Sequence, residues 1–67
     1  MVKCYSLEVD EDAESRKYLI YKEFQDGRRL LWDRKMLRKH AVEFITKEAN
    51  KDGVPMYIRP GVFRRKV

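Results

Sequence analysis

Alternating apolar and polar positions predict a strand, a turn and a β-hairpin in the first half of the chain. Residues 2–9 follow the two-residue period of an extended chain, and residues 16–25 are rich in aromatic and β-branched side chains. The acidic residues between them suit an exposed turn. Asp26-Gly27 is the clearest turn signal in the sequence, so residues 29–32 are expected to return as a third strand.

The side chains of the hairpin favour one register. A three-residue loop at 26–28 pairs Phe24 with Leu30 and Lys22 with Trp32, whereas a two-residue loop sets Phe24 opposite Arg29 and mixes the two faces. We expect the first register, because a single apolar face is what fixes strand pairing. That face consists of Tyr18, Ile20, Phe24, Leu30 and Trp32.

A helical period follows the hairpin. Asp33 is predicted as the helix N-cap, since its carboxylate can accept the free N–H groups of the first turn. The helix is expected to continue to about Lys51 and to stop at Gly53, which can adopt a left-handed conformation. Its apolar stripe consists of Leu37, Ala41, Phe44 and Ile45.

Residues 54–58 alternate again and predict a last strand. Pro55 and Pro60 lack an amide donor, which favours a short strand at a sheet edge. Residues 62–67 form a basic tail that either adds a final pairing or stays loose. The predicted fold class is α+β, with a small antiparallel sheet of three to four strands, one amphipathic helix on one face, and the order β-β-β-α-β. Residues 1–67 are expected to form a single domain.

Composition indicates a folded protein with a densely charged surface. Apolar residues make up 43% of the 67 residues and charged residues 40%, against about 25% charged in an average domain. No apolar run approaches the roughly 20 residues of a membrane span, so no membrane partner is expected. Cys4 is the one cysteine and no secretion signal is recognised, which predicts a cytoplasmic protein.

The charge is unevenly distributed and predicts an anionic partner. Residues 1–26 carry four basic and seven acidic side chains, a net charge of −3, while residues 27–67 carry twelve basic and four acidic, a net charge of +8. Cations gathered at the hairpin return, the helix start and the tail suit the phosphates of a nucleic acid. A solvated charged face is the other interpretation. The predicted nucleic-acid-binding residues are Arg28, Arg29, Arg34, Lys35, Arg38, Lys39, Arg64, Arg65 and Lys66.

A second hypothesis is a protein-binding module. If the helix covers one face of the sheet, the other face shows an apolar and aromatic patch of the kind that marks a protein interface. The chain would then be a small inhibitor or adaptor, a phage-type regulator, that docks on a larger protein through that face or a strand edge. Homodimerisation is compatible with either hypothesis. The patch consists of Leu19, Tyr21, Leu31 and Tyr57.

No set of residues with catalytic or metal-binding spacing is recognised. His40 is the one histidine and has no second ligand or nucleophile at a suitable spacing, so we expect a half-buried structural residue. Cys4 is expected to be a small buried hydrophobe. The acidic residues at 10–14 lack the pattern of a calcium loop, and they are therefore predicted to form a solvated turn. The sequence therefore predicts a non-enzymatic protein without cofactor or metal.

Overall fold

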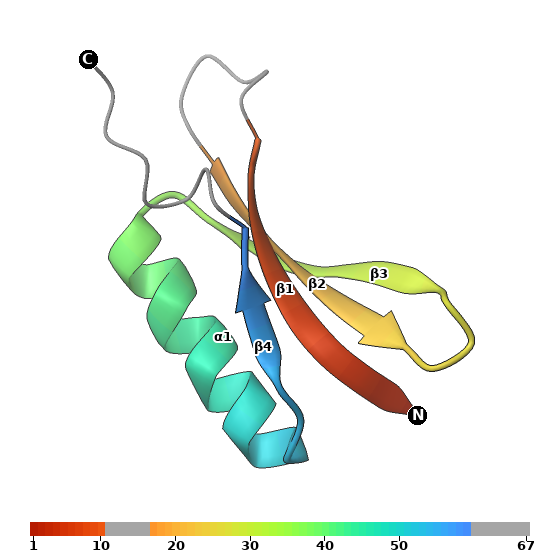
Figure 1. The fold of residues 1–67 in the computed structure, drawn as a ribbon. Coiled ribbons are helices and arrows are strands. Elements are labelled where there is room, and N and C mark those ends of the chain that lie inside the picture. The colour runs from red at the N-terminus through yellow and green to blue at the C-terminus, as the bar shows by residue number, and fades with distance from the viewer. Residues whose placement is uncertain (11–16, 60–67) are drawn as a thin grey trace.

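A computed structural model describes residues 1–10 and 17–59, and it shows four strands and one helix (Figure 1). The predicted tail at 62–67 lies outside the described residues. The α+β class and the order β-β-β-α-β are confirmed. The elements are β1 (Val2–Asp10), β2 (Lys17–Phe24), β3 (Arg29–Lys35), α1 (Arg38–Asp52) and β4 (Met56–Ile58).

The sheet has the order β3-β2-β1-β4 and is mixed. The first three strands pair antiparallel, but β4 runs parallel to β1. The expectation of a wholly antiparallel sheet was wrong for this strand, because α1 carries the chain back to the end of the sheet where β1 and β3 begin. The short strand β4 lies at an edge, as the two prolines predicted.

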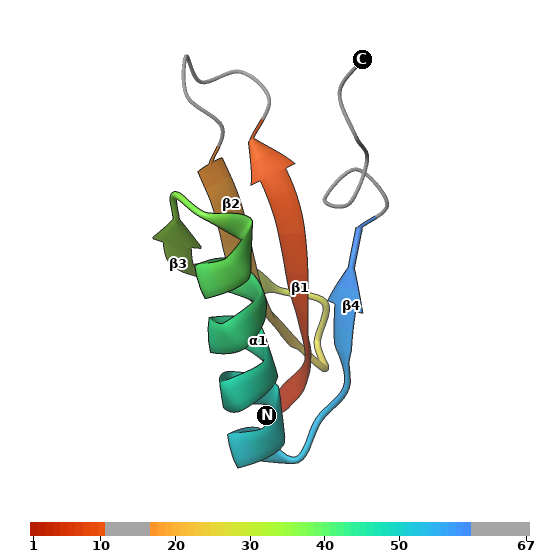
Figure 2. The same ribbon diagram turned by 90° about the vertical axis from the view of Figure 1, so that its left-hand side faces the viewer.

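The core lies between α1 and one face of the sheet (Figure 2). Ala41, Ile45 and Ala49 are spaced by four residues and form the buried stripe of the helix. They pack against the alternate side chains of β1 and β2 that point the same way, including Leu7 and Ile20, which are fully buried. The sequence period therefore identified the central part of the stripe correctly.

Tyr5 links the start of the sheet to the end of the helix. Its ring is fully buried in the core, and its hydroxyl donates a 2.6 Å hydrogen bond to Asp52 Oδ2. Burial, followed by this bond, raises the pKa of Tyr5 well above its usual value. The phenol therefore stays protonated at neutral pH and anchors the last turn of α1 to β1.

The hairpin register differs from the predicted one. The loop has three residues, as expected, but it covers 25–27, so Phe24 lies opposite Arg28 and Lys22 opposite Leu30. The predicted pairs Phe24–Leu30 and Lys22–Trp32 were wrong because Gly27 has a φ of 94° and takes the left-handed third position of the loop. The partner of each β2 residue is displaced by two positions along β3, and because two is an even number each side chain of the hairpin keeps its predicted face.

Asp33 lies in β3 and does not cap the helix. Ile20 pairs with Asp33 and Tyr21 with Leu31, so Trp32 is an extra residue that forms a β-bulge and β3 continues to Lys35. The Asp33 carboxylate accepts the N–H of Arg34 at 2.7 Å instead. The N-cap is Leu37, which was predicted to be part of the buried stripe and is exposed.

The outer end of the hairpin extends beyond the helix (Figure 1). Trp32 lies at the margin of the covered area, where its indole N–H donates to Glu48 of α1 at 3.4 Å. The Lys22 ammonium lies 3.4 Å from the centroid of the Trp32 ring. Leu30 and Trp32 have the predicted orientation, but they stay exposed because one helix is too narrow to cover four strands.

Candidate functional site

Two glutamates and two arginines form a charged cluster on the face of the sheet that α1 does not cover. Glu8, Glu23 and Arg29 come from β1, β2 and β3, and Arg59 directly follows β4. The Arg29 guanidinium lies 2.5 Å from Glu8 and 3.4 Å from Glu23. Arg59 contacts the same two carboxylates at 3.4 and 3.8 Å. The cluster has no net charge and holds the four strands together on this face.

Small polar side chains lie beneath this cluster. Ser6 is fully buried, and its hydroxyl donates a 2.7 Å hydrogen bond to Glu23 Oε2. The thiol of Cys4 contacts Glu23 Oε1 at 3.7 Å, and burial followed by this carboxylate raises its pKa. Cys4 is buried, as predicted, but on the polar face of the sheet and outside the apolar core. The protonated thiol is a structural donor here.

The pKa of Glu23 is lowered, which couples this cluster to stability at acid pH. The Ser6 hydrogen bond is the largest lowering cause, followed by the charge of Arg29. A carboxylate with a lowered pKa in the folded state stabilises the fold above its unfolded pKa of about 4.3, and this contribution is lost as pH falls through the folded pKa.

Glu23→Gln is therefore expected to lower the free energy of unfolding by about 1 kcal/mol at pH 7, because the ion pairs with both arginines are lost. The difference from the wild type should shrink as pH falls below the unfolded pKa, because the contribution of the Glu23 carboxylate is then progressively lost. Urea denaturation at pH 7 and pH 3 measures both effects. Glu43→Gln, at an exposed position of α1, is the matched control, and an equal loss in the two variants contradicts the role of the cluster.

Three of the six predicted nucleic-acid-binding residues in the described part of the chain bind carboxylates. Arg28 pairs with Asp26 at 2.7 Å, Arg29 belongs to the charged cluster, and Lys35 pairs with Asp33 at 3.3 Å. Each pair lowers the positive charge that a phosphate backbone would meet. The structure thus leaves less free positive charge in this region than the sequence suggests.

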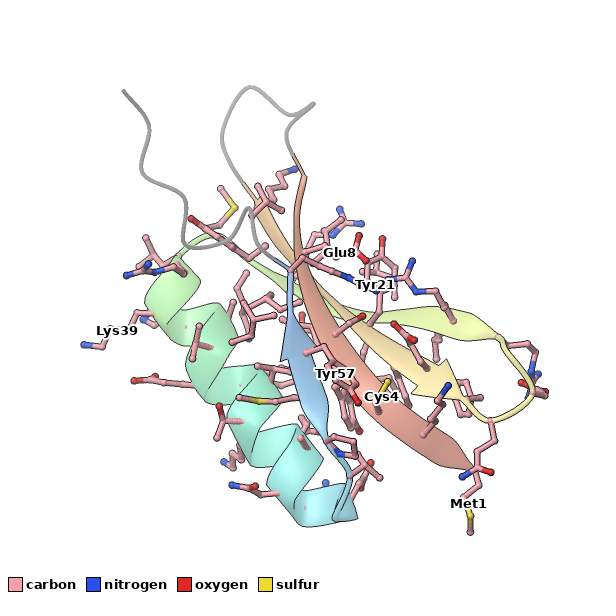
Figure 3. The ribbon with its side chains drawn as sticks, viewed as in Figure 1. Met1, Cys4, Glu8, Tyr21, Lys39 and Tyr57 are labelled. Carbon is pink, nitrogen blue, oxygen red and sulfur yellow. The ribbon has the colours of Figure 1, made fainter. Side chains whose placement is uncertain are left out.

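The other predicted cations point in different directions. Arg34 lies beside Leu19 on the helix-free face, whereas Lys39 projects from α1 away from the sheet (Figure 3). Within residues 1–10 and 17–59, neither has an ion pair with a carboxylate. Arg38 occupies the first turn of α1 and is exposed. The predicted tail cations Arg64, Arg65 and Lys66 lie outside the described residues.

The four residues of the alternative patch share the helix-free face, as predicted. The strand register sets Tyr21 and Tyr57 on opposite sides of Ser6, and Leu31 next to Tyr21 (Figure 3). Tyr21 is half-buried because the Arg29 guanidinium lies 4.0 Å from its ring centroid. Leu19 is also half-buried, so the most exposed members of this patch are Leu31 and Tyr57.

Exposed apolar side chains are concentrated along β3 and the turn into α1, with Leu31 on the helix-free face of the sheet and Leu30 and Trp32 on the helix side. Of the seven large apolar side chains that are exposed in the described part of the chain, five lie between residues 30 and 37. We call these five side chains the 30–37 surface. They are Leu30 (48% exposed), Leu31 (39%), Trp32 (41%), Met36 (56%) and Leu37 (56%). Clusters of exposed apolar side chains are a common feature of interaction sites.

Leu37 is also a poor residue for its place in the helix. It is the N-cap of α1 and provides no side-chain hydrogen bond, and the first turn contains no acidic residue. Leucine is among the least favourable N-caps, and Arg38 and Lys39 lie next to the positive end of the helix dipole. A position that breaks local rules without a compensating contact is typical of a functional surface.

An open hollow of about 350 Å³ lies between the end of β3 and α1, and it is lined by Lys35, His40, Glu43, Phe44 and Lys47. His40 is exposed, which corrects the expectation of a half-buried histidine, because residue 40 is on the outer side of the first turn. The Lys35 ammonium lies 4.8 Å from the Phe44 ring centroid. No group of three metal-ligating side chains occurs in the part of the chain that the structure describes.

Comparison with protein families, with curated proteins and with solved structures finds no match for this chain. Among the described residues, no helix is both long and apolar enough to cross a membrane.

Proposed function

We propose that this chain is a small non-enzymatic adaptor or inhibitor that docks on a larger protein through the 30–37 surface. The observation that supports this most is the concentration of exposed apolar side chains in one eight-residue stretch, along the edge of the sheet that no other described strand covers. Burying such side chains contributes about 25 cal/mol per Å², so their exposure is unfavourable unless a partner covers them.

Charges around this surface indicate the chemistry of the partner. Arg34 lies within the stretch and Lys39 follows it, and neither is paired with a carboxylate in residues 1–10 and 17–59. An interface usually has an apolar centre and a polar rim of complementary charge. We therefore expect the partner to present an apolar depression with acidic residues around it.

Affinity capture from the native host after nuclease treatment tests the proposal. The wild type is expected to retain one protein in stoichiometric amount, and Met36→Ser/Leu37→Ser is expected to lose it. Lys39→Ala/Lys47→Ala, which removes two exposed cations of α1, is the matched control and should retain the protein with at most a modest loss.

Nucleic-acid binding through the basic residues stays a prediction, and it leads to the opposite result in the affinity capture. In that case, the captured material is nucleic acid, it disappears with nuclease, and the lysine variant loses it whereas the Met36→Ser/Leu37→Ser variant does not. Its binding should also weaken steeply with salt. That set of results overturns the proposal of a protein-docking surface.

A further inference from the structure

Among residues 1–10 and 17–59, no strand pairs with the outer edge of β3, and the backbone groups that point toward this edge can be assigned. The N–H of Phe24 donates to the carbonyl of Arg28 at 2.9 Å, which makes these two residues a hydrogen-bonded pair. Antiparallel pairs alternate between hydrogen-bonded and non-hydrogen-bonded. Leu30 therefore directs its backbone groups toward β2, and Arg29 and Leu31 direct theirs toward the open edge.

The bulge at Trp32 limits how another strand can pair with this edge. The extra residue shifts the alternation, so Asp33 shares the helix side of the sheet with Trp32. Regular pairing with a further strand is thus possible over residues 28–32. An added strand must present its own outward groups opposite Arg29 and Leu31.

A second copy of β3 meets these conditions in one register. If the two copies pair antiparallel about a two-fold axis, the residue on the axis faces itself. An axis at Arg29 brings two like charges together. An axis at Leu31 sets Arg29 opposite Asp33, and this register is unfavourable because the two side chains lie on opposite faces of the sheet. An axis at Leu30 sets Arg29 opposite Leu31, and both of these residues have backbone groups pointing outward.

The side chains are compatible with this register. On the helix side, Leu30 meets Leu30 of the second copy, and Arg28 lies opposite Trp32, a pairing that places a cation against an aromatic ring. On the other side, Leu31 lies against the aliphatic part of Arg29, whose guanidinium remains with Glu8 and Glu23. No two like charges are directly opposite each other, and the nearest cation to Arg28 of the second copy is Lys22, whose ammonium lies 3.4 Å from the Trp32 ring centroid.

We propose that a second copy of this chain adds to the open edge of β3, pairing antiparallel about a two-fold axis at Leu30 and joining two four-stranded sheets into one. This inference rests on the proposed function and divides the 30–37 surface between two partners, because the second copy covers Leu30, Leu31 and Trp32 and leaves the rest of the surface to the larger protein. Met36 and Leu37 lie beyond the paired strands and stay available to the larger protein, one pair on each copy.

A charge exchange at Leu30 tests this register. Leu30→Lys and Leu30→Glu each place a charge against its own copy, so each variant alone is expected to be a monomer of 8.2 kDa. An equimolar mixture of the two is expected to form a dimer of twice that mass, because unlike charges then meet at the axis. Sedimentation velocity across a range of concentrations measures all three samples beside the wild type, which should dimerise as concentration rises.

Backbone and folding controls complete the experiment. Leu31→Pro removes the N–H that faces the open edge and should weaken dimerisation at least about tenfold, whereas Leu31→Ala keeps this N–H and should weaken it less. Circular dichroism establishes that each variant is folded. A wild type that stays monomeric at every concentration, or a mixture that does not dimerise, overturns the inference. Either result leaves the proposed function intact if Met36→Ser/Leu37→Ser still abolishes capture of the larger protein.

Discussion

Leu37→Asp is expected to stabilise the fold and to abolish partner binding. An aspartate at the N-cap can accept N–H groups of the first turn, which contributes about 0.5–2 kcal/mol, and its charge favours the helix dipole by about 0.3–1 kcal/mol. Little burial is lost, since Leu37 is 56% exposed. For a domain of this size, each 1 kcal/mol raises the Tm by roughly 4–8 °C.

Thermal denaturation and affinity capture measure the two effects separately. Leu37→Ala is the control, because it shortens the side chain without adding a cap and should leave the Tm nearly unchanged. A Leu37→Asp variant that is more stable and still binds the partner contradicts a role of Leu37 in docking. A variant with a lower Tm contradicts the position of the N-cap.

Ile45→Ala is expected to destabilise the protein by about 2–5 kcal/mol, because it leaves a cavity in the centre of the core. The side chain of Ile45 projects from α1 toward the sheet, is fully buried, and belongs to the same core cluster as Leu7 and Ile20. The total stability of a chain of 67 residues is on the order of 3–10 kcal/mol, so the variant should be partly unfolded at 37 °C.

Urea denaturation followed by far-ultraviolet circular dichroism measures this loss. Ile45→Val removes a single methyl group and should cost about 0.5–1.5 kcal/mol, and the exposed Lys47→Ala should change stability by less than about 0.5 kcal/mol. If Ile45→Ala behaves like Lys47→Ala, α1 does not pack on the sheet as described.

The order of the elements could be predicted from the sequence because each element has a clear local pattern. The alternation in residues 2–9 and the four-residue spacing of Ala41, Ile45 and Ala49 both reflect contacts with one continuous core. The face of most strand residues could also be predicted from parity, but parity failed at the irregularities in β1 and β3. The direction of β4 could not be predicted, because it depends on how α1 returns the chain.

Two local signals were misleading. Asp33 has the chemistry of an N-cap, but strand pairing with Ile20 retains it in β3. Gly27 correctly indicated a turn, but it occupies the third position of the loop and not the predicted second position. The strand register follows from this position of the glycine. In both cases, long-range pairing or backbone geometry determined the outcome, and neither can be read from neighbouring residues.

The candidate site was predicted in part. Leu30 and Trp32 were predicted on the apolar face of the hairpin and lie on it, but they stay exposed because α1 does not extend over the end of the hairpin (Figure 1). The charged cluster was missed. Its signal is the polar alternation of Cys4, Ser6 and Glu8 in a strand whose other face is apolar, which indicates a polar network on the helix-free face.

The most direct test of the central claim is photo-crosslinking in the native host. A photo-reactive amino acid is placed at position 37 in one variant and at position 47, on an exposed part of α1, in the other. We predict an adduct with one larger protein from position 37 and no such adduct from position 47. Crosslinking of that protein from position 47 alone, or of nucleic acid alone from both positions, would contradict a docking surface at residues 30–37.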